Sequence, residues 1–173
     1  MRQFFLLIVI FPYFAINAQK TEKSYIMSFY KDGLLFFILP QPIFKTSNNI
    51  AQKDFIFDIT YLTKNDSSSF TATYTTKINF PADSIHIQDS DGSVISTPLK
   101  MIFIDKKSSQ WIYRVRFMVS FELLRRLYIS EYPYRVYIVS NKNRIEYQYS
   151  TNEWKKKRKK MNEILDIIKI NKE

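Results

Sequence analysis

Apolar and polar side chains alternate along much of the chain between Ser24 and Ser150. In the stretch DFIFDITYL, for example, Phe55, Phe57 and Ile59 occupy every second position. A period of two places such residues on one face of a β-strand, because successive side chains point to opposite sides. The pattern therefore predicts a series of strands, each with one buried face.

Turn-forming residues divide these strands into pairs, and five segments each predict a β-hairpin. Asp-Gly is typical of a type I′ turn, in which both central residues have positive φ. The segment Pro40 to Asp54 is polar and contains two prolines, so we expect a long loop there. The five predicted hairpins are residues 24–40 around Asp32-Gly33, 54–78 around 64–67, 84–97 around Asp91-Gly92, 99–119 around 106–109, and 134–150 around 141–143.

Two segments instead have the spacing of an α-helix. The first is SFELLRRLYIS, in which Ser120 is a candidate N-cap and the apolar residues recur every three or four positions. The second is the C-terminal segment 151–170, where Ser150 and Glu153 have the spacing of a capping box. Trp154 should pin the first turn of this helix to the rest of the fold.

The fold class that follows is mainly β: an antiparallel β-sandwich or open barrel of about ten strands. A short helix lies between the fourth and fifth hairpins, and an amphipathic C-terminal helix covers one open face or end. We expect residues 19–173 to form a single domain, since no interdomain linker stands out and the length suits one domain.

Residues 1–18 predict a secretory signal peptide, with a positive start at Arg2, an apolar run from Phe4 to Ile16, and Ala18 before the expected cleavage point. The run is shorter than the roughly 20 residues of a membrane helix. Two alternatives are a buried first strand and an uncleaved anchor. An exported protein, periplasmic or extracellular, with no transmembrane span in the mature chain is the expectation.

The chain has no cysteine, so it forms no disulfide and offers no cysteine for a lipid anchor. Its stability must come from burial of the core and from hydrogen bonds. The net charge of +10 makes this a basic protein and favours acidic partners, such as nucleic acid, anionic glycans or an anionic membrane surface.

Groups that could carry out catalysis are scarce. His86 is the one histidine and is either a general base or metal ligand, or a surface residue on the polar side of a strand. Asp89 and Asp91 resemble the start of a calcium loop, although an ordinary hairpin turn explains them as well. We therefore predict no catalytic residue, no metal and no cofactor. A hydrolase that uses Asp58, Asp89 or Glu122 is a weaker hypothesis, because nothing pairs these carboxylates in the sequence.

Basic residues suggest a candidate anion-binding surface in two places. If their strands are neighbours, Arg114, Arg116 and Arg135 form one polar sheet face, together with Arg144 and Glu146. The alternative is a solvent face with cross-strand pairs to Glu146. On the C-terminal helix, four further candidates fall on the side away from Trp154, namely Lys155, Lys156, Lys159 and Lys160.

The basic run 155–160 is open to three interpretations. It is the solvated side of a packed helix, a contact for an anionic surface or polymer, or a nucleic-acid site. Nucleic-acid binding is the weakest, because the run offers only Trp154 beside its cations. The favoured function is a non-enzymatic binding or accessory protein of the cell envelope, whose partner is another envelope protein or an anionic surface. The alternative function is a binder of an anionic polymer or membrane.

Several features together resemble small exported proteins of unknown function from Bacteroidota-type bacteria. They are the NAQ end of the leader, the DSDGSVIS hairpin, the short helix SFELLRRL after a long strand, and a closing helix that begins with tryptophan. The resemblance covers the layout of most of the mature chain and implies a periplasmic or surface β-sandwich. It carries over no active site.

Overall fold

A computed structural model describes residues 24–31, 33–44, 54–141 and 143–172. The predicted signal peptide, residues 1–18, lies outside these ranges. The strands are β1 (Tyr25–Tyr30), β2 (Gly33–Ile43), β3 (Phe55–Leu62), β4 (Ser67–Thr76), β5 (Ser84–Gln88), β6 (Val94–Pro98), β7 (Lys100–Lys107), β8 (Gln110–Ser120), β9 (Arg135–Ser140) and β10 (Asn143–Gln148), and the helices are α2 (Phe121–Ile129) and α3 (Thr151–Ile170).

These strands form two antiparallel sheets. One has six strands in the order β1-β2-β3-β4-β8-β7, and the other has four in the order β10-β9-β5-β6. All five predicted hairpins are confirmed, because each pair of consecutive strands is hydrogen-bonded. Two pairings between distant segments, β4 with β8 and β5 with β9, complete the sheets.

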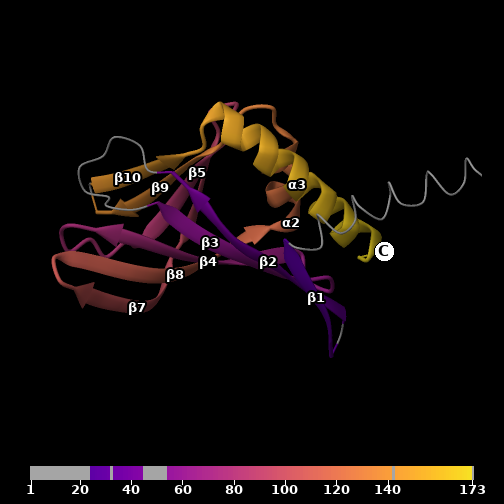
Figure 1. Cartoon of the computed structure of the whole chain (residues 1–173), viewed down its shortest axis with the longest axis horizontal. Coiled ribbons are helices and arrows are strands. Elements are labelled where there is room, and N and C mark those ends of the chain that lie inside the picture. Colours follow the sequence, from indigo (N-terminus) through magenta and orange to yellow (C-terminus); the bar gives the residue numbers. More distant parts are fainter. Residues whose placement is uncertain (1–23, 32, 45–53, 142, 173) are drawn as a thin grey trace, which may run out of the picture.

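The sheets face each other to form an open sandwich, and the two helices fill the side where the sheets diverge (Figure 1). Phe55 on β3 contacts Tyr147 on β10, with ring centroids 5.3 Å apart, which joins the two sheets. Tyr61 on β3 contacts Phe121 at the start of α2, with centroids 4.8 Å apart. The predicted mainly β, sandwich-like fold with a C-terminal helix is thus confirmed.

Both helices begin as the sequence predicts. The hydroxyl of Ser120 accepts a hydrogen bond from the N–H of Leu123 at 3.1 Å, and Ser150 accepts one from Glu153 at 3.3 Å. Trp154 is fully buried and stacks on Tyr128 of α2, with centroids 5.3 Å apart. This contact holds α3 against α2 and the sandwich. None of the described helices has the length and apolar character to cross a membrane.

The expectation that Gly33 occupies the centre of a turn is wrong. The register pairs Tyr30 with Gly33, so the glycine is the first residue of β2. Among the described glycines, positive φ occurs at Gly92, where it is +85° in the predicted turn between β5 and β6, and Ser108 and Asn141 also have positive φ. Gly33 is needed for space, because a Cβ atom there would lie 2.6 Å from Oγ1 of Thr63. That oxygen accepts a hydrogen bond from Leu34 N–H at 3.0 Å.

The predicted loop between the first two hairpins begins later than expected. β2 continues through Pro40 and Pro42 to Ile43, and residues 45–53 lie outside the described part. β1 reaches only as far as Ile38 along β2, and the register between β2 and β3 shifts between Ile38 and Gln41. Proline cannot donate to a ladder, but it is tolerated at such an irregular, one-sided position.

Candidate functional site

The arginines that the sequence suggested as one surface do not lie together. Arg114 and Arg116 are on β8 in the six-stranded sheet, whereas Arg135 is on β9 in the four-stranded sheet. Within their sheets, β8 lies between β4 and β7, and β9 lies between β5 and β10. The condition that these strands be neighbours fails, so the expected shared arginine face is wrong.

Arg114 and Arg135 each have a carboxylate nearby. Nη2 of Arg114 lies 3.7 Å from Oδ2 of Asp58, and Nε of Arg135 lies 3.7 Å from Oε1 of Glu146. Burial raises the pKa of Asp58, while Arg114 and then Arg116 oppose that shift. The guanidinium of Arg144 stacks over the ring of Tyr137 at 4.8 Å. These contacts support the alternative of solvent-facing strands held by cross-strand pairs.

The basic face of α3 is placed as the sequence predicts. Lys155, Lys156, Lys159 and Lys160 are all exposed, on the side of the helix opposite Trp154. A shallow cleft of about 900 Å³ runs along part of this face. Three basic and three acidic residues line it, so its charge is balanced: Lys155, Arg158 and Lys159, with Glu131, Glu163 and Asp166.

The candidate chemical groups take part in local structure. His86 is half-buried on β5, opposite Ser96 of β6 and Tyr137 of β9. Oδ1 of Asp89 accepts hydrogen bonds from the N–H groups of Asp91 and Ser93, at 3.1 and 2.9 Å, so this carboxylate closes the hairpin turn. Across the described ranges, no three His, Cys, Asp or Glu residues are grouped so that they could hold a metal ion.

The carboxylates of the hydrolase hypothesis come from three different parts of the chain's fold. Asp58 is on β3 and pairs with Arg114, while Asp89 follows β5 in the other sheet and lies 3.4 Å from Nη2 of Arg126. Glu122 is exposed in the first turn of α2. Glu122 lines a cleft of about 630 Å³ beside α2, where Lys172 forms an ion pair with Asp66.

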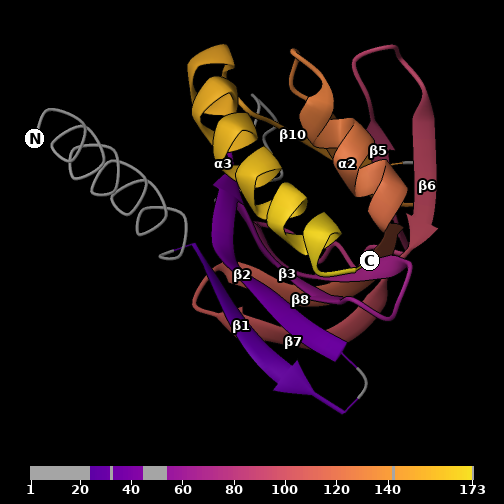
Figure 2. The same cartoon turned by 90° about the vertical axis from the view of Figure 1, so that its right-hand side faces the viewer.

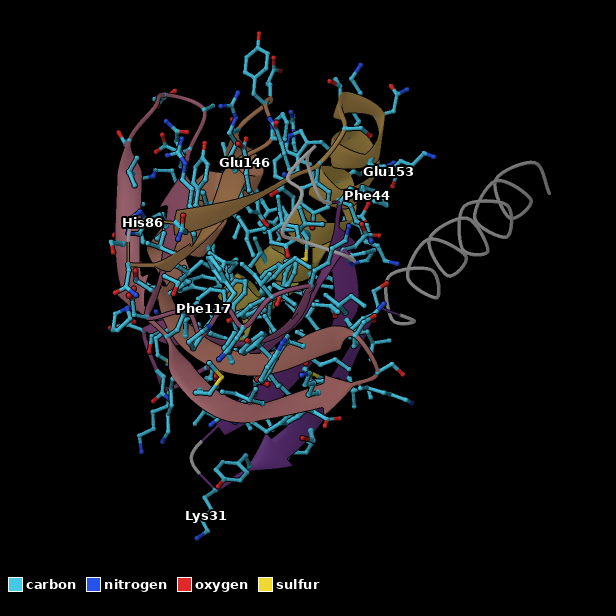
Figure 3. The ribbon with its side chains drawn as sticks, turned by 90° about the vertical axis from the view of Figure 1, so that its left-hand side faces the viewer. Lys31, Phe44, His86, Phe117, Glu146 and Glu153 are labelled. Carbon is cyan, nitrogen blue, oxygen red and sulfur yellow. The ribbon has the colours of Figure 1, made fainter. Side chains whose placement is uncertain are left out.

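The most unusual surface is one that the sequence did not single out. On β1, Ile26, Met27, Phe29 and Tyr30 are 58%, 48%, 92% and 55% exposed, and we call these four residues the β1 surface. Residues at both odd and even positions are exposed, so neither face of the strand is covered from Ile26 to Tyr30, whereas Tyr25 is partly buried against Phe36. Lys31, next along the chain, projects from one extremity of the molecule (Figure 3).

A signal for this surface was present in the sequence. The run YIMSFY has apolar side chains at odd and at even positions and carries no charge. A strand with one solvent face would alternate, so this pattern indicates either complete burial or an uncovered apolar strand. The sequence alone could not distinguish these two cases, because they depend on the position of the strand within the sheet.

β1 differs from the strands at the other three sheet edges. Edge strands in monomeric proteins are commonly protected by charges, by proline or by bulges, since their open backbone groups can pair with another chain. β7 carries four charged residues and a register shift, β10 carries Arg144 and Glu146, and β6 is short and ends at Pro98. β1 has none of these protections between Tyr25 and Tyr30.

Comparison of the chain with protein-family models, with curated proteins and with solved structures finds no significant match.

Proposed function

We propose that this protein is an exported, non-enzymatic binding or accessory protein of the cell envelope, and that it acts by presenting the β1 surface to another polypeptide. The observation that carries the proposal is the uncovered edge strand β1, which is apolar on both faces and uncharged. The leader-like pattern of residues 1–18 supports the exported location, periplasmic or extracellular.

An open sheet edge suits the binding of an extended segment. The edge supplies backbone N–H and C=O groups that a second strand can pair with, and alternate side chains supply contacts on both faces. Solvent-exposed apolar side chains that lie next to one another are a common mark of an interaction site. Phe29 and Tyr30 add large aromatic surfaces, which contribute strongly to protein interfaces.

The non-enzymatic part of the proposal rests on the contacts of the candidate chemical groups. Asp89 is used in closing a turn, and Asp58 lies beside Arg114. An enzyme would need an acid, base or nucleophile poised over a cleft. These two carboxylates instead contact neighbouring groups of the fold.

A photo-reactive phenylalanine analogue at position 29 tests the proposal in the host cell. Phe103, on the opposite edge of the same sheet, is also exposed and provides the matched control. We expect light-dependent adducts with a polypeptide from position 29 and none of the same kind from position 103. Absence of adducts at position 29, or the same adducts from both positions, would contradict the proposal.

A second candidate function is contact with an anionic polymer or membrane through the basic face of α3. The observation in its favour is that Lys155, Lys156, Lys159 and Lys160 are exposed together on one side of the helix. Such contacts weaken steeply as salt increases, because binding releases counterions from the polyanion and this release becomes less favourable at higher salt concentration.

Heparin chromatography in a salt gradient tests this second function. Replacement of the four lysines by glutamine should bring elution to a markedly lower salt concentration. A variant with Lys100, Lys106 and Lys107 of β7 replaced by glutamine is the control, because these lysines are also exposed but lie on a different element. Unchanged retention of the α3 variant would rule the second function out.

A further inference from the structure

We infer that the polypeptide which covers the β1 surface is a second copy of this chain, paired antiparallel along β1 about a two-fold axis at Ser28. The two six-stranded sheets then become one continuous sheet. This inference rests on the proposed function, since it names the partner of the same surface. The direction of the backbone groups, the side chains along the strand and the distribution of charge support it.

The backbone pattern of β1 determines which residues can bond to a new strand. Leu39 N–H donates to Ser24 C=O at 2.9 Å, so these two residues form a hydrogen-bonded pair. From Tyr25 opposite Ile38 to Tyr30 opposite Gly33, the register of β1 with β2 then continues without a shift. Hydrogen-bonded and non-hydrogen-bonded pairs alternate in an antiparallel ladder. The backbone groups of Ser28 therefore face β2, and those of Met27 and Phe29 face away from the sheet.

This alternation allows a symmetric pairing of two β1 strands. With Ser28 opposite Ser28 of the second copy, Met27 lies opposite Phe29, and their outward backbone groups exchange hydrogen bonds on both sides of the axis. Ile26 then lies opposite Tyr30 on the other face. Each pair joins apolar side chains directly across the strands, which is the arrangement that stabilises neighbouring strands.

The neighbouring register is less favourable. If Met27 instead lay opposite itself, Ser28 would lie opposite Ile26 and Tyr30 opposite Ser24 of the second copy, so these pairs would join a polar to an apolar side chain. With Ser28 on the axis, Lys31 lies opposite Tyr25, an aromatic residue. An isologous contact of this kind closes after two copies, so it does not continue into a fibre.

The size of the surface predicts a moderate affinity. The four residues of the β1 surface expose on the order of 500 Å² per copy, given that a large aromatic side chain offers roughly 150–250 Å². Leu35 and Phe37 of β2 are partly exposed on the same face as Ile26 and add to this area. A specific interface buries about 800 Å² per partner, so we expect dimers that dissociate in the micromolar range.

The charge of the chain does not prevent this contact. β1 has no charged residue, and the N-terminal half of α3, where the basic run lies, is at the far end of the molecule from β1 (Figure 2). Glu153, next to the basic run, and Lys31, at the end of β1, likewise lie at opposite ends of the side-chain view (Figure 3). Salt screens the remaining repulsion between two basic chains, so it should favour the dimer.

The first test measures mass in solution. The full chain is expressed in its host, and the form of the protein that the host produces from it is purified. Its mass is then measured by sedimentation at concentrations from about 1 to about 100 µM. We expect a monomer at the low end and a dimer at the high end. Ser28→Lys should lower the association at least tenfold, because it places two cations on the axis, while Ser96→Lys on the edge strand β6 should leave it unchanged.

A chain without cysteine also allows a direct test of the register. Ser28 would form a non-hydrogen-bonded pair with its counterpart, with Cα atoms about 4.5 Å apart, which suits a disulfide. Ser28→Cys should therefore form a covalent dimer under mild oxidation, and Ser96→Cys should not. Equal oxidation of both variants, or a monomeric wild type at all concentrations, would overturn the inference.

The outcomes also separate this inference from the proposed function. Cross-linking from position 29 to a different protein, with a monomeric wild type, overturns the second copy and leaves the proposed function standing. Adducts of twice the chain mass from position 29 support both. Longer assemblies without a Ser28→Cys disulfide would indicate pairing of β1 with β7 of the next copy and would overturn the two-fold dimer. No adduct at all would remove both.

Discussion

The rings of Tyr74 and Tyr113 stack on neighbouring strands of the large sheet, with centroids 4.7 Å apart and planes 8° apart. Both hydroxyls form hydrogen bonds with the segment that connects β4 to β5 in the other sheet. Tyr74 donates to the carbonyl of Phe80 at 3.0 Å and accepts from the N–H of Ala82 at 3.1 Å. Tyr113 accepts from the N–H of Phe80 at 2.6 Å. This stacked pair therefore fixes the crossover between the sheets.

Tyr74→Phe should destabilise the fold by about 1–3 kcal/mol, because it leaves the buried carbonyl of Phe80 and the N–H of Ala82 without the Tyr74 hydroxyl. Tyr147→Phe is the control: its hydroxyl is buried and has no hydrogen-bond partner among the described residues, so removal should be neutral or slightly stabilising. Urea unfolding of both variants measures the difference. Equal losses would show that the bonds to the crossover contribute little.

Alkaline pH should destabilise the protein through the buried tyrosines beside Trp154. Burial raises the pKa of Tyr128 to about 12, and it raises the pKa of Tyr134 and Tyr149 as well. An unfolded tyrosine titrates near 10, so below that pH both states keep the proton and stability is constant. From pH ~10 to ~12 the unfolded chain loses protons that the folded chain retains, and the free energy of unfolding falls.

Tyr128→Phe should reduce this alkaline loss by about 2 kcal/mol when urea unfolding is compared at pH 8 and pH 11.5. Tyr132→Phe is the matched control, because the ring of Tyr132 is exposed. If Tyr128→Phe and the wild type have identical pH profiles of stability, Tyr128 loses its proton at the same pH in the folded and the unfolded chain. That result would contradict a raised pKa of Tyr128 in the fold.

Trp154→Ala should cost about 3–5 kcal/mol, because it removes a fully buried aromatic side chain from the contact between α3 and α2. Trp154→Phe should cost less, since a ring remains against Tyr128 and the main loss is the hydrogen bond from Nε1 to the Ser130 carbonyl at 3.3 Å. Lys156→Ala, on the exposed side, should fall within about 0.5 kcal/mol of the wild type. Thermal unfolding ranks the three variants.

Arg114→Gln should raise the pKa of Asp58 further above its usual range. Burial already raises this pKa, and Arg114 makes the largest contribution that opposes the rise. Titration of the Asp58 carboxyl carbon by NMR measures the change, with Arg135→Gln in the other sheet as the control. A pKa of Asp58 that falls or stays the same in Arg114→Gln would contradict the role assigned to this pair.

Local patterns predicted most of the secondary structure. The hairpins follow from alternation and turn residues, and the helix starts follow from Ser120 and Ser150, because these signals act within a few residues of the chain. The inclusion of Pro40 and Pro42 in strand β2 could not be predicted in the same way. Whether a proline interrupts a strand depends on which side of the strand has a neighbour, and β1 ends before these positions.

The candidate sites depended on strand order, which no local pattern specifies. Arg114 and Arg135 have similar surroundings in the sequence, yet the pairings of β8 with β4 and of β9 with β5 place them in different sheets. The same holds for the β1 surface, whose exposure follows from its place at the end of the six-stranded order. By contrast, the outward position of Lys155 and Lys159 followed from helical periodicity alone.

The position of α3 after all the described strands bears on how the protein is made. The helix contacts β2 through Met161, whose sulfur accepts a hydrogen bond from Gln41 at 3.3 Å, and it covers apolar groups that are synthesised more than a hundred residues earlier. Until residues 151–170 emerge, those groups stay open to water. Folding must therefore finish late, and until then the exposed apolar groups of the nascent chain favour aggregation.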